Sequence, residues 1–356
     1  MSENAVPGAH AHAAARAVRR PEHRPPSMAD VAQLAGVSHQ TVSRVLNAHP
    51  NVSAKTKLRV QAAIEQLGYR PNRAARALVT GRSQVIGVVA QSTALFGPAA
   101  VLTAVERALS DAGFSVGVAS VPVLDRDSIR SAVERLLEQR VGGIVVIAPI
   151  MSASEALSEV PPDLPFVSVD GDPQSSFRLV TVDQQLGGRL ATEHLLSAGH
   201  ETVWHVSGPS DWFDSAGRLA GWRAALAAAG AAEPPVIKAD WSLAAGYDAG
   251  LMLARIPEVH AVFAANDHLA VGIMKAMREA HRTVPDDVSI VGFDDIPEAA
   301  YLDPALTTVR PDFAAVGTHT VRVLQQQLQD VMPAEQTMTS VPPVLVARES
   351  VTPPRR

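Results

Sequence analysis

Between residues 28 and 68, apolar residues recur every three or four positions, a spacing that predicts three short amphipathic helices. Serines at positions 27, 38 and 53 are suited to cap the three helices, with Asp30 as the capping-box partner of the first serine. Glycines 36 and 68 would end the first and third helices. The predicted inner stripes are Val31, Leu34 and Ala35, then Val42, Val45 and Leu46, then Val60, Ile64 and Leu67. Three such helices can share one small core.

From residue 85 the pattern changes to short apolar runs that alternate with segments of helical length. Eight runs predict buried strands: VIGVVA (85–90), FSVGVA (114–119), GGIVVI (142–147), PFVSVD (165–170), TVWHVS (202–207), PVIKAD (235–240), HAVFAA (260–265) and VSIVGF (288–293). This alternation predicts an α/β organisation with parallel sheets covered on both faces. Ligands of such sheets bind at the carboxyl ends of the strands.

The composition places the chain among folded proteins of more than one domain. It has 356 residues, 47% of them apolar, and no cysteine, which excludes disulfides, cysteine-bound zinc and thiol nucleophiles. No apolar run is long enough to span a membrane, and no apolar stretch of an export signal follows Arg19 and Arg20. We therefore expect a cytoplasmic protein.

Charge is distributed unevenly along the chain. Residues 1–26 hold four arginines against two acids, residues 27–82 hold eight basic residues against two acids, and the rest holds 19 basic residues against 32 acids. A basic head on an acidic body indicates that only the head approaches a polyanion. Residues 1–26 have the composition of a disordered basic arm.

The polar face of the second helix indicates which polyanion the head binds. It carries His39, Gln40, Ser43 and Arg44 and no acidic residue. A tight turn followed by a helix with such a face is the helix-turn-helix arrangement, in which Gln40 can pair with adenine and Arg44 with guanine in the major groove. From the spacing alone, a three-helix bundle with a solvated basic surface remains the alternative.

The segment NRAARALVTG (72–81) reads as one more short helix, with Asn72 as its cap and Gly81 as its stop. A helix of this length is unstable by itself, so it would order only when docked. Arg73 and Arg76 suit phosphates, and Leu78 suits a wedge between base steps of the minor groove.

Polar side chains follow several predicted strands of the body. Asp170, Asn266 and Asp294 each come directly after an apolar run, while Asp267 is interpreted as a helix cap. Carboxylates and an amide near Arg218 and the indole of Trp241 are what a carbohydrate needs, because hydroxyls require donors and acceptors and the ring packs on an aromatic plane.

An enzyme is disfavoured by the same residues. Paired acids can hydrolyse glycosides, but nothing else in the chain indicates catalysis. The histidines at positions 194, 200, 205, 260 and 268 lack metal-ligand spacing and are interpreted as surface or helix-end residues. No Walker-type phosphate loop is present. We expect no catalytic residue, no metal and no cofactor.

Nine motifs in the same order resemble the LacI/GalR family of bacterial repressors over about 320 residues: DVAQLAGVSHQTVSRVLN, VSAKT, YRPNRAARAL, LLEQRVGGIVV, GRLAGW, DWS, AANDHLAVG, SIVGFDD and PALTTVRPDF. The resemblance implies an α/β chain with an all-α helix-turn-helix head and a two-lobed body like that of periplasmic binding proteins. It implies a transcriptional repressor of carbohydrate-utilisation genes that a small sugar releases from its operator. A sugar-binding transport receptor would need an export signal and no basic head.

The resemblance also implies residue roles. His39, Gln40 and Arg44 would read bases, residues 72–78 would form a hinge helix, and Leu78 would be the minor-groove wedge. The DNA-binding surface would include Ser43, Asn47, Lys55, Asn72, Arg73 and Arg76. Asp170, Asn266, Asp294 and Arg218 would hold sugar hydroxyls, Trp241 would stack on the ring, and Phe313 and Leu95 would be apolar lining. Trp212 departs from the family pattern and would either add a stacking surface or close the cleft.

The expected organisation is therefore a basic arm (1–26), a DNA-binding domain (27–71), a hinge (72–82), a two-lobed sugar-binding and dimerisation domain (83–350) and a disordered tail (351–356). The chain ends in ARESVTPPRR without the leucine-repeat helix of tetrameric family members, which predicts a homodimer on a pseudo-palindromic operator. We further hypothesise that sugar binding rotates the lobe nearest the DNA and unfolds the hinges. A galactoside is the expected effector, with a β-glucoside or a purine-like molecule as alternatives.

Overall fold

The computed structural model describes residues 26–46, 51–69, 83–91, 94–157, 160–174, 177–329 and 338–354. The chain divides into two compact units between Thr80 and Gly81. The arm at 1–25, Asn47 and the proposed hinge at 72–82, with Asn72, Arg73, Arg76 and Leu78, lie outside the described residues.

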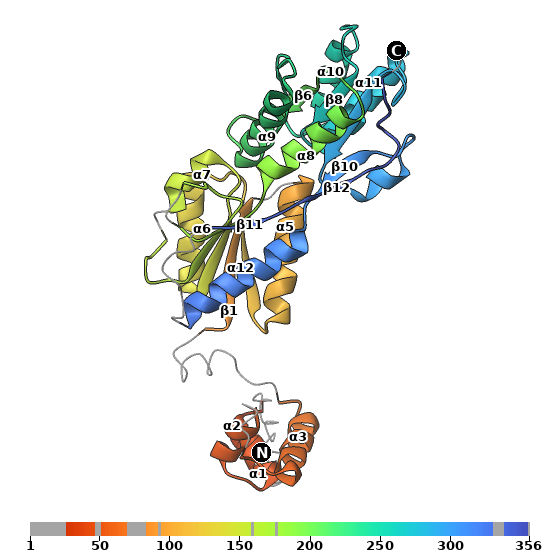
Figure 1. Cartoon of the computed structure of the whole chain (residues 1–356). Coiled ribbons are helices and arrows are strands. Elements are labelled where there is room, and N and C mark those ends of the chain that lie inside the picture. Colours follow the sequence, from red (N-terminus) through yellow and green to blue (C-terminus); the bar gives the residue numbers. More distant parts are fainter. Residues whose placement is uncertain are drawn as a thin grey trace, which may run out of the picture. The chain divides into compact units, whose positions relative to one another are not determined.

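The first unit contains the three predicted helices, α1 (Met28–Ala35), α2 (His39–Leu46) and α3 (Ala54–Leu67) (Figure 1). The predicted caps are confirmed. Ser27 Oγ accepts a hydrogen bond from the backbone N of Asp30, whose carboxylate accepts one from the backbone N of Ser27 at 2.7 Å. Ser38 and Ser53 accept hydrogen bonds from backbone amides at 3.1 and 3.2 Å. Glycines 36 and 68 end α1 and α3 with φ of +60° and +62°, which a residue with a Cβ rarely adopts.

The core of this unit corrects one predicted position. Val31, Val42 and Val60 are completely buried. Leu34, however, is 45% exposed, because the buried face of α1 runs through Val31, Ala32 and Ala35. Arg59 of α3 donates to the carbonyl oxygens of Ala35 and Gly36 and so fixes the turn that precedes α2.

The second unit consists of two lobes, each built on a six-stranded sheet (Figure 1). The first sheet is parallel throughout and has the order β11 (Met338–Val341), β5 (Leu179–Val182), β4 (Phe166–Val169), β3 (Gly143–Ile147), β1 (Val85–Gln91), β2 (Ser115–Val121). The second has the order β12 (Val344–Val346), β10 (Thr307–Arg310), β9 (Ser289–Phe293), β8 (Ala261–Ala264), β6 (Trp204–Ser207), β7 (Ile237–Lys238). All its pairs are parallel except β10 with β12.

All eight predicted strands are present, as β1 to β4 and β6 to β9. Sequence patterning missed β5, β10, β11 and β12, which are only three or four residues long. The helices of this unit are α5 (Phe96–Asp111), α6 (Arg126–Glu138), α7 (Met151–Ala156), α8 (Gln184–Ser197), α9 (Phe213–Ala229), α10 (Leu243–Leu253), α11 (Asp267–Glu279), η2 (Pro297–Tyr301) and α12 (Phe313–Leu328). No helix among the described residues is long and apolar enough to cross a membrane.

The chain passes between the lobes three times. It leaves the first sheet after β5, returns after β10 to form α12 and β11, and crosses again to β12. Ile147, Asp170 and Asp294 therefore lie at the carboxyl ends of β3, β4 and β9, on strands of both sheets. This is the position where ligands of parallel sheets bind.

The C-terminal residues correct the expected organisation. A disordered tail was predicted from residue 351, yet the backbone N of Thr352 donates to Ser289 Oγ at 3.1 Å, and Ser289 Oγ donates to the Thr352 carbonyl at 3.0 Å. Val351 packs against the core of the second lobe. Residues 351–354 are thus part of the body, because their backbone completes hydrogen bonds beside the start of β9.

Candidate functional site

A narrow cavity lies at the carboxyl ends of the strands, between the two lobes. It is lined by Gly97, Pro98, Ile147, Pro149, Asp170, Gln184, Asp214, Arg218, Asp294, Pro311 and Phe313. Four predicted site residues meet there: Asp170, Arg218, Asp294 and Phe313. Gly97, Pro98, Ile147, Pro149 and Pro311 add a mostly apolar lining beside the charged groups, whose interactions are stronger there than in water.

Arg218 is the central group of the cavity. It lies on α9 and is 4% exposed, and its guanidinium stacks over the ring of Phe293 at 3.7 Å. Its Nε donates to Gln184 Oε1 at 2.9 Å and its Nη1 donates to the carbonyl oxygen of Ala265 at 2.6 Å. Its remaining nitrogen, Nη2, lies 3.7 Å from Asp214 and 3.6 Å from Asp294.

Close packing of α8 on α9 holds this arginine in place. A Cβ at Gly188 would lie 2.2 Å from the carbonyl oxygen of Arg218, and one at Gly221 would lie 2.0 Å from that of Gln185. Both glycines therefore allow the two helix backbones to approach each other. The approach also brings Gln184, the first residue of α8, within hydrogen-bond distance of Arg218.

Asp170 and Asp294 have backbone conformations that residues with a Cβ seldom adopt, with φ of +53° and +106°. Such conformations cost about 1–3 kcal/mol and are concentrated at functional sites. Asp170 Oδ1 accepts hydrogen bonds from Thr181 Oγ1 at 3.1 Å and from the backbone N of Val182 at 3.3 Å. The strain turns the carboxylates of two different sheets into one cavity.

Burial governs the protonation of these carboxylates. It raises the pKa of Asp170 to about 7, with a further contribution from the charge of Asp214. Burial also raises the pKa of Asp294 to about 7, against the opposing effect of Arg218. The pKa of Asp214 itself is raised by burial and lowered by Arg218 and by a hydrogen bond with Gln184. One arginine is thus shared by three carboxylates.

Asp214 and Gln184 were missed by sequence reasoning. Asp214 lies one helical turn before Arg218, a spacing at which a carboxylate and a guanidinium meet, so the signal was present in the sequence. Gln184 follows β5, one of the strands that the hydrophobic pattern did not reveal.

Four other predicted residues do not line this cavity. Trp241 is 8% exposed and lies beside it, with its ring 5.5 Å from the guanidinium of Arg218 and against the backbone of Gly208. Asn266 caps α11 through Leu269 N and donates to the Trp241 carbonyl at 3.2 Å. Leu95 precedes α5 and packs against the hydrophobic core.

The fourth, Trp212, lies where the lobes touch. Its ring meets that of Trp241 edge-on at 5.5 Å, and it is 8% exposed. Its backbone bridges to Ile150, while Phe213 N donates to the Pro149 carbonyl at 2.9 Å. Of the two interpretations, the one in which Trp212 closes the cleft fits this position, because no open face of the indole is left for stacking.

Asp267 is not the helix cap that was predicted. The cap of α11 is Asn266. The Asp267 carboxylate instead accepts hydrogen bonds from the backbone N of Ile296 at 2.9 Å and from Thr308 Oγ1 at 2.6 Å. Burial raises its pKa to about 8, so it ties the end of β9 to β10 largely in the protonated form near neutral pH.

Two histidines are buried, contrary to the surface interpretation: His200, which is 6% exposed, and His205. His205 is neither a surface nor a helix-end residue: it is completely buried in β6, stacked on Phe263 at 4.7 Å and on Trp222 at 5.4 Å. Burial lowers its pKa to about 4. Among the residues that the structure describes, no group of three or more His, Asp or Glu could hold a metal ion.

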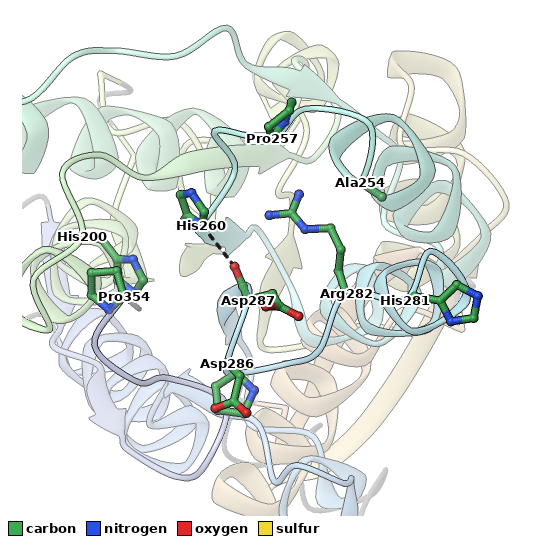
Figure 2. Close-up of a pocket in the computed structure, with 10 residues that line it drawn as sticks. His200, Ala254, Pro257, His260, His281, Arg282, Asp286, Asp287 and Pro354 are labelled. Carbon is green, nitrogen blue, oxygen red and sulfur yellow. Dashed lines mark hydrogen bonds between the residues drawn. The ribbon is translucent and has the colours of Figure 1, made fainter. Parts of the chain in front are cut away.

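A second cavity lies at the opposite ends of the strands of the second lobe, where β8 and β9 begin (Figure 2). There His260 Nδ1 contacts the Asp287 carbonyl at 3.2 Å, and Arg282 donates to the carbonyl oxygens of Ile256 and Val259. His200 contacts the carbonyl oxygen of Thr352 at 3.1 Å. These side chains satisfy loop carbonyls, which is a structural role.

The first unit presents the predicted DNA-reading surface on α2. His39, Gln40 and Arg44 are exposed on this helix, Ser43 is half-buried, and Val42 packs inward. Lys55 is exposed in the first turn of α3. The described part of this surface carries no acidic residue on α2, which suits contact with phosphates.

Comparison with known proteins agrees with both units. Residues 27–72 match the family model described as bacterial regulatory proteins, lacI family, and residues 192–351 match a periplasmic binding protein-like domain. The lactose operon repressor of Escherichia coli K12 is 33% identical over 336 residues, which cover 93% of this chain and 92% of that protein. The chain belongs to the LacI family of bacterial regulatory proteins.

Solved structures of LacI-family proteins have the same architecture. A crystal structure of the lac repressor dimer bound to operator and the anti-inducer ONPF matches with a TM-score of 0.82 and 33% identity, covering 92% of this chain and 100% of that one. A complex of the transcriptional regulator CelR with cellobiose matches with a TM-score of 0.67 and 31% identity, covering 91% and 99% of the two chains. The predicted helix-turn-helix head and two-lobed α/β body are thereby confirmed.

Proposed function

We propose that this LacI-family protein is a homodimeric transcriptional repressor that binds a pseudo-palindromic operator and is released from it by a small sugar. The observation that carries the proposal is the cavity at the strand ends, where Asp170, Asp294 and Arg218 from both lobes face one space. It acts in the cytoplasm, on the nucleoid when it is bound to DNA, and controls carbohydrate-utilisation genes.

The exposed face of α2 supports the DNA-binding part. Gln40 and Arg44 have two-pronged ends that match adenine and guanine edges, and His39 lies beside them. The lac repressor structure that this chain resembles is a dimer bound to operator. Two heads held by one dimer would meet two half-sites.

The chemistry of the cavity supports a polyhydroxylated effector. Carboxylates accept from hydroxyls, the free edge of Arg218 donates to them, and Phe313 provides an apolar face. A galactoside is the first candidate. The match to the CelR–cellobiose complex makes a β-glucoside the second.

The proposal is tested by fluorescence anisotropy with labelled DNA from the upstream region of the protein's own gene. The full chain is added first, and galactosides, glucosides and purines are then titrated separately. Release by one sugar class and not by purines is the expected result. DNA binding that no sugar reverses would contradict the effector assignment and leave the DNA-binding assignment intact.

A further inference from the structure

Among the described residues that line the cavity, three carboxylates face one arginine, so the negative charge exceeds the positive charge. Asp214 adds to this excess, and its charge contributes to the raised pKa of both Asp170 and Asp294. Arg218 approaches two of these carboxylates only at 3.6 and 3.7 Å, since its shortest hydrogen bonds go to the neutral oxygens of Gln184 and Ala265. With all three carboxylates ionised, two negative charges would remain uncompensated in a buried space.

The side chains that line the cavity also offer more hydrogen-bond acceptors than donors. Asp294 is 7% exposed and faces the cavity, and no donor among the described residues forms a hydrogen bond with its carboxylate. The Gln184 side chain is already engaged with Arg218 and Asp214. Acceptors therefore outnumber free donors, so a fitting ligand must be rich in donors.

Without a ligand, protons can neutralise these carboxylates, because burial raises the pKa of Asp170 and Asp294 to about 7. Two features allow a cation to replace those protons. Asp170 accepts two hydrogen bonds, from Thr181 Oγ1 and the backbone N of Val182, and Asp214 is hydrogen-bonded to Gln184; bonds of this kind stabilise the ionised form. Because no described group suits a metal ion, an organic cation is the better candidate. An ammonium group offers three donors, one positive charge and no acceptor.

We infer that the effector is an aminohexose, whose protonated amine pairs with the Asp170, Asp214 and Asp294 carboxylates that Arg218 leaves uncompensated. This inference rests on the proposed function, because it names the class of sugar that the same cavity takes. Ring hydroxyls would bind the remaining carboxylate oxygens and Nη2 of Arg218. Phe313 would supply the apolar wall.

Isothermal titration calorimetry of the full chain at pH 7 tests the inference. The probes are glucosamine, galactosamine, mannosamine and 6-amino-6-deoxyglucose, each compared with its parent hexose and with the N-acetylated form, which has no charge. At least one amino sugar should bind about tenfold more tightly than both its parent hexose and its N-acetylated form. This is the ratio expected when one positive charge lies close to a carboxylate. Parent hexoses that bind as well as every amine would overturn the inference.

The variant Asp214→Asn tests whether the preference for an amino sugar over its parent hexose arises in this cavity. It removes one charge while keeping the shape and the hydrogen bond with Gln184, so the amine-to-hexose affinity ratio should fall about tenfold. A loss of both affinities in equal proportion would show a structural role and overturn the inference. The control is Asp127→Asn, at a carboxylate that is 83% exposed on α6, which should keep the wild-type ratio.

Operator release by the same panel separates the two proposals. If parent hexoses bind and release DNA while no amine does, the proposed function stands and the aminohexose inference is wrong. If neither class binds, both are wrong. Release by a free amine at concentrations where its parent hexose has no effect supports both.

Discussion

Arg218 and Asp294 face each other from different elements of the second lobe, with Nη2 of the arginine 3.6 Å from Oδ1 of the aspartate. That distance is too long for a direct hydrogen bond. The arginine is anchored instead through its Nε, which donates to Gln184, and its Nη1, which donates to the Ala265 carbonyl. The pair thus presents two polar groups to the same space, which has a volume of about 10 Å³ and must widen before a sugar can contact both.

Arg218→Ala should lower the free energy of unfolding by about 3–5 kcal/mol, because it removes the one cationic side chain that the described lining of the cavity offers to the buried carboxylates. Urea denaturation measures this directly. Arg223→Ala is the matched control on the same helix: its ion pair with Glu233 is half-exposed and should contribute less than about 1 kcal/mol. Equal losses in the two variants would contradict the central role of Arg218.

The stability of the body should fall as pH rises from 7 to 8. Asp267 has a pKa of about 8 in the folded protein, far above its value of 3.8 in a free side chain, so the folded state binds the additional proton. Raising the pH removes that proton and the stability linked to it, by up to about 1.4 kcal/mol per pH unit. Asp170 and Asp294 act in the same direction up to about pH 7.

His205 acts in the opposite direction at lower pH. Its pKa is about 4 when folded and 6.5 when free, so acidification from pH 6.5 to 4 favours the unfolded state.

Because the effect of His205 is confined to pH values below 7, urea denaturation at pH 7, 7.5 and 8 measures the contribution of the carboxylates to the pH dependence of stability. Asp267→Asn should flatten the slope, whereas Asp248→Asn, at an exposed position of α10, should retain it. An unchanged slope in Asp267→Asn would refute the assignment.

Gly221→Ala should destabilise the protein by about 1–3 kcal/mol, because the new methyl group would meet the Gln185 carbonyl oxygen and push α8 from α9. The same displacement moves Arg218 relative to Gln184, so effector affinity should fall as well. Ala220→Ser, at the exposed neighbouring position, should change stability by less than about 0.5 kcal/mol. Thermal unfolding and calorimetry of both variants measure the two effects.

Arg44→Ala should weaken operator binding by about 1–3 kcal/mol and relax the preference for the base that it reads. Lys55→Ala should weaken binding to all DNA equally and lower the salt slope by about one, as expected for a phosphate contact. Anisotropy titrations on operator and scrambled DNA at several salt concentrations distinguish the two. An equal loss of base preference in both variants would contradict this division of roles.

Much of this fold was predictable because its signals are local. Serine caps, glycine stops and long apolar runs depend on neighbours in sequence, and they located the three head helices and eight of the strands. Asp170 and Asp294, which follow predicted strands, line one cavity together with Arg218 of α9. Parallel-sheet topology explains why Asp170 and Asp294 each lie at the carboxyl end of a strand, but the position of Arg218 depends on the packing of α9 against α8.

The remaining features depend on tertiary contacts. β11 and β12 are ordered by strands far away in the sequence, and residues 351–354 by Ser289. Asp267 was misassigned because its partners, Ile296 and Thr308, lie 29 and 41 residues further along the chain. Leu34 was misassigned because helical spacing allows either of two adjacent faces of α1 to be buried. The face with Val31, Ala32 and Ala35 is buried, and Leu34 lies outside it.

A repressor of this kind requires that ligand binding in the cavity changes the affinity of the DNA-binding head for its operator. This coupling is tested most directly by measuring operator affinity by anisotropy with and without a saturating sugar whose binding calorimetry has already established. Operator affinity should be at least tenfold weaker with the sugar bound, and Arg218→Ala should show no such change. A sugar that binds the cavity and leaves operator affinity unchanged would contradict the proposed function, since a ligand shifts an equilibrium only through its differential affinity for the two states.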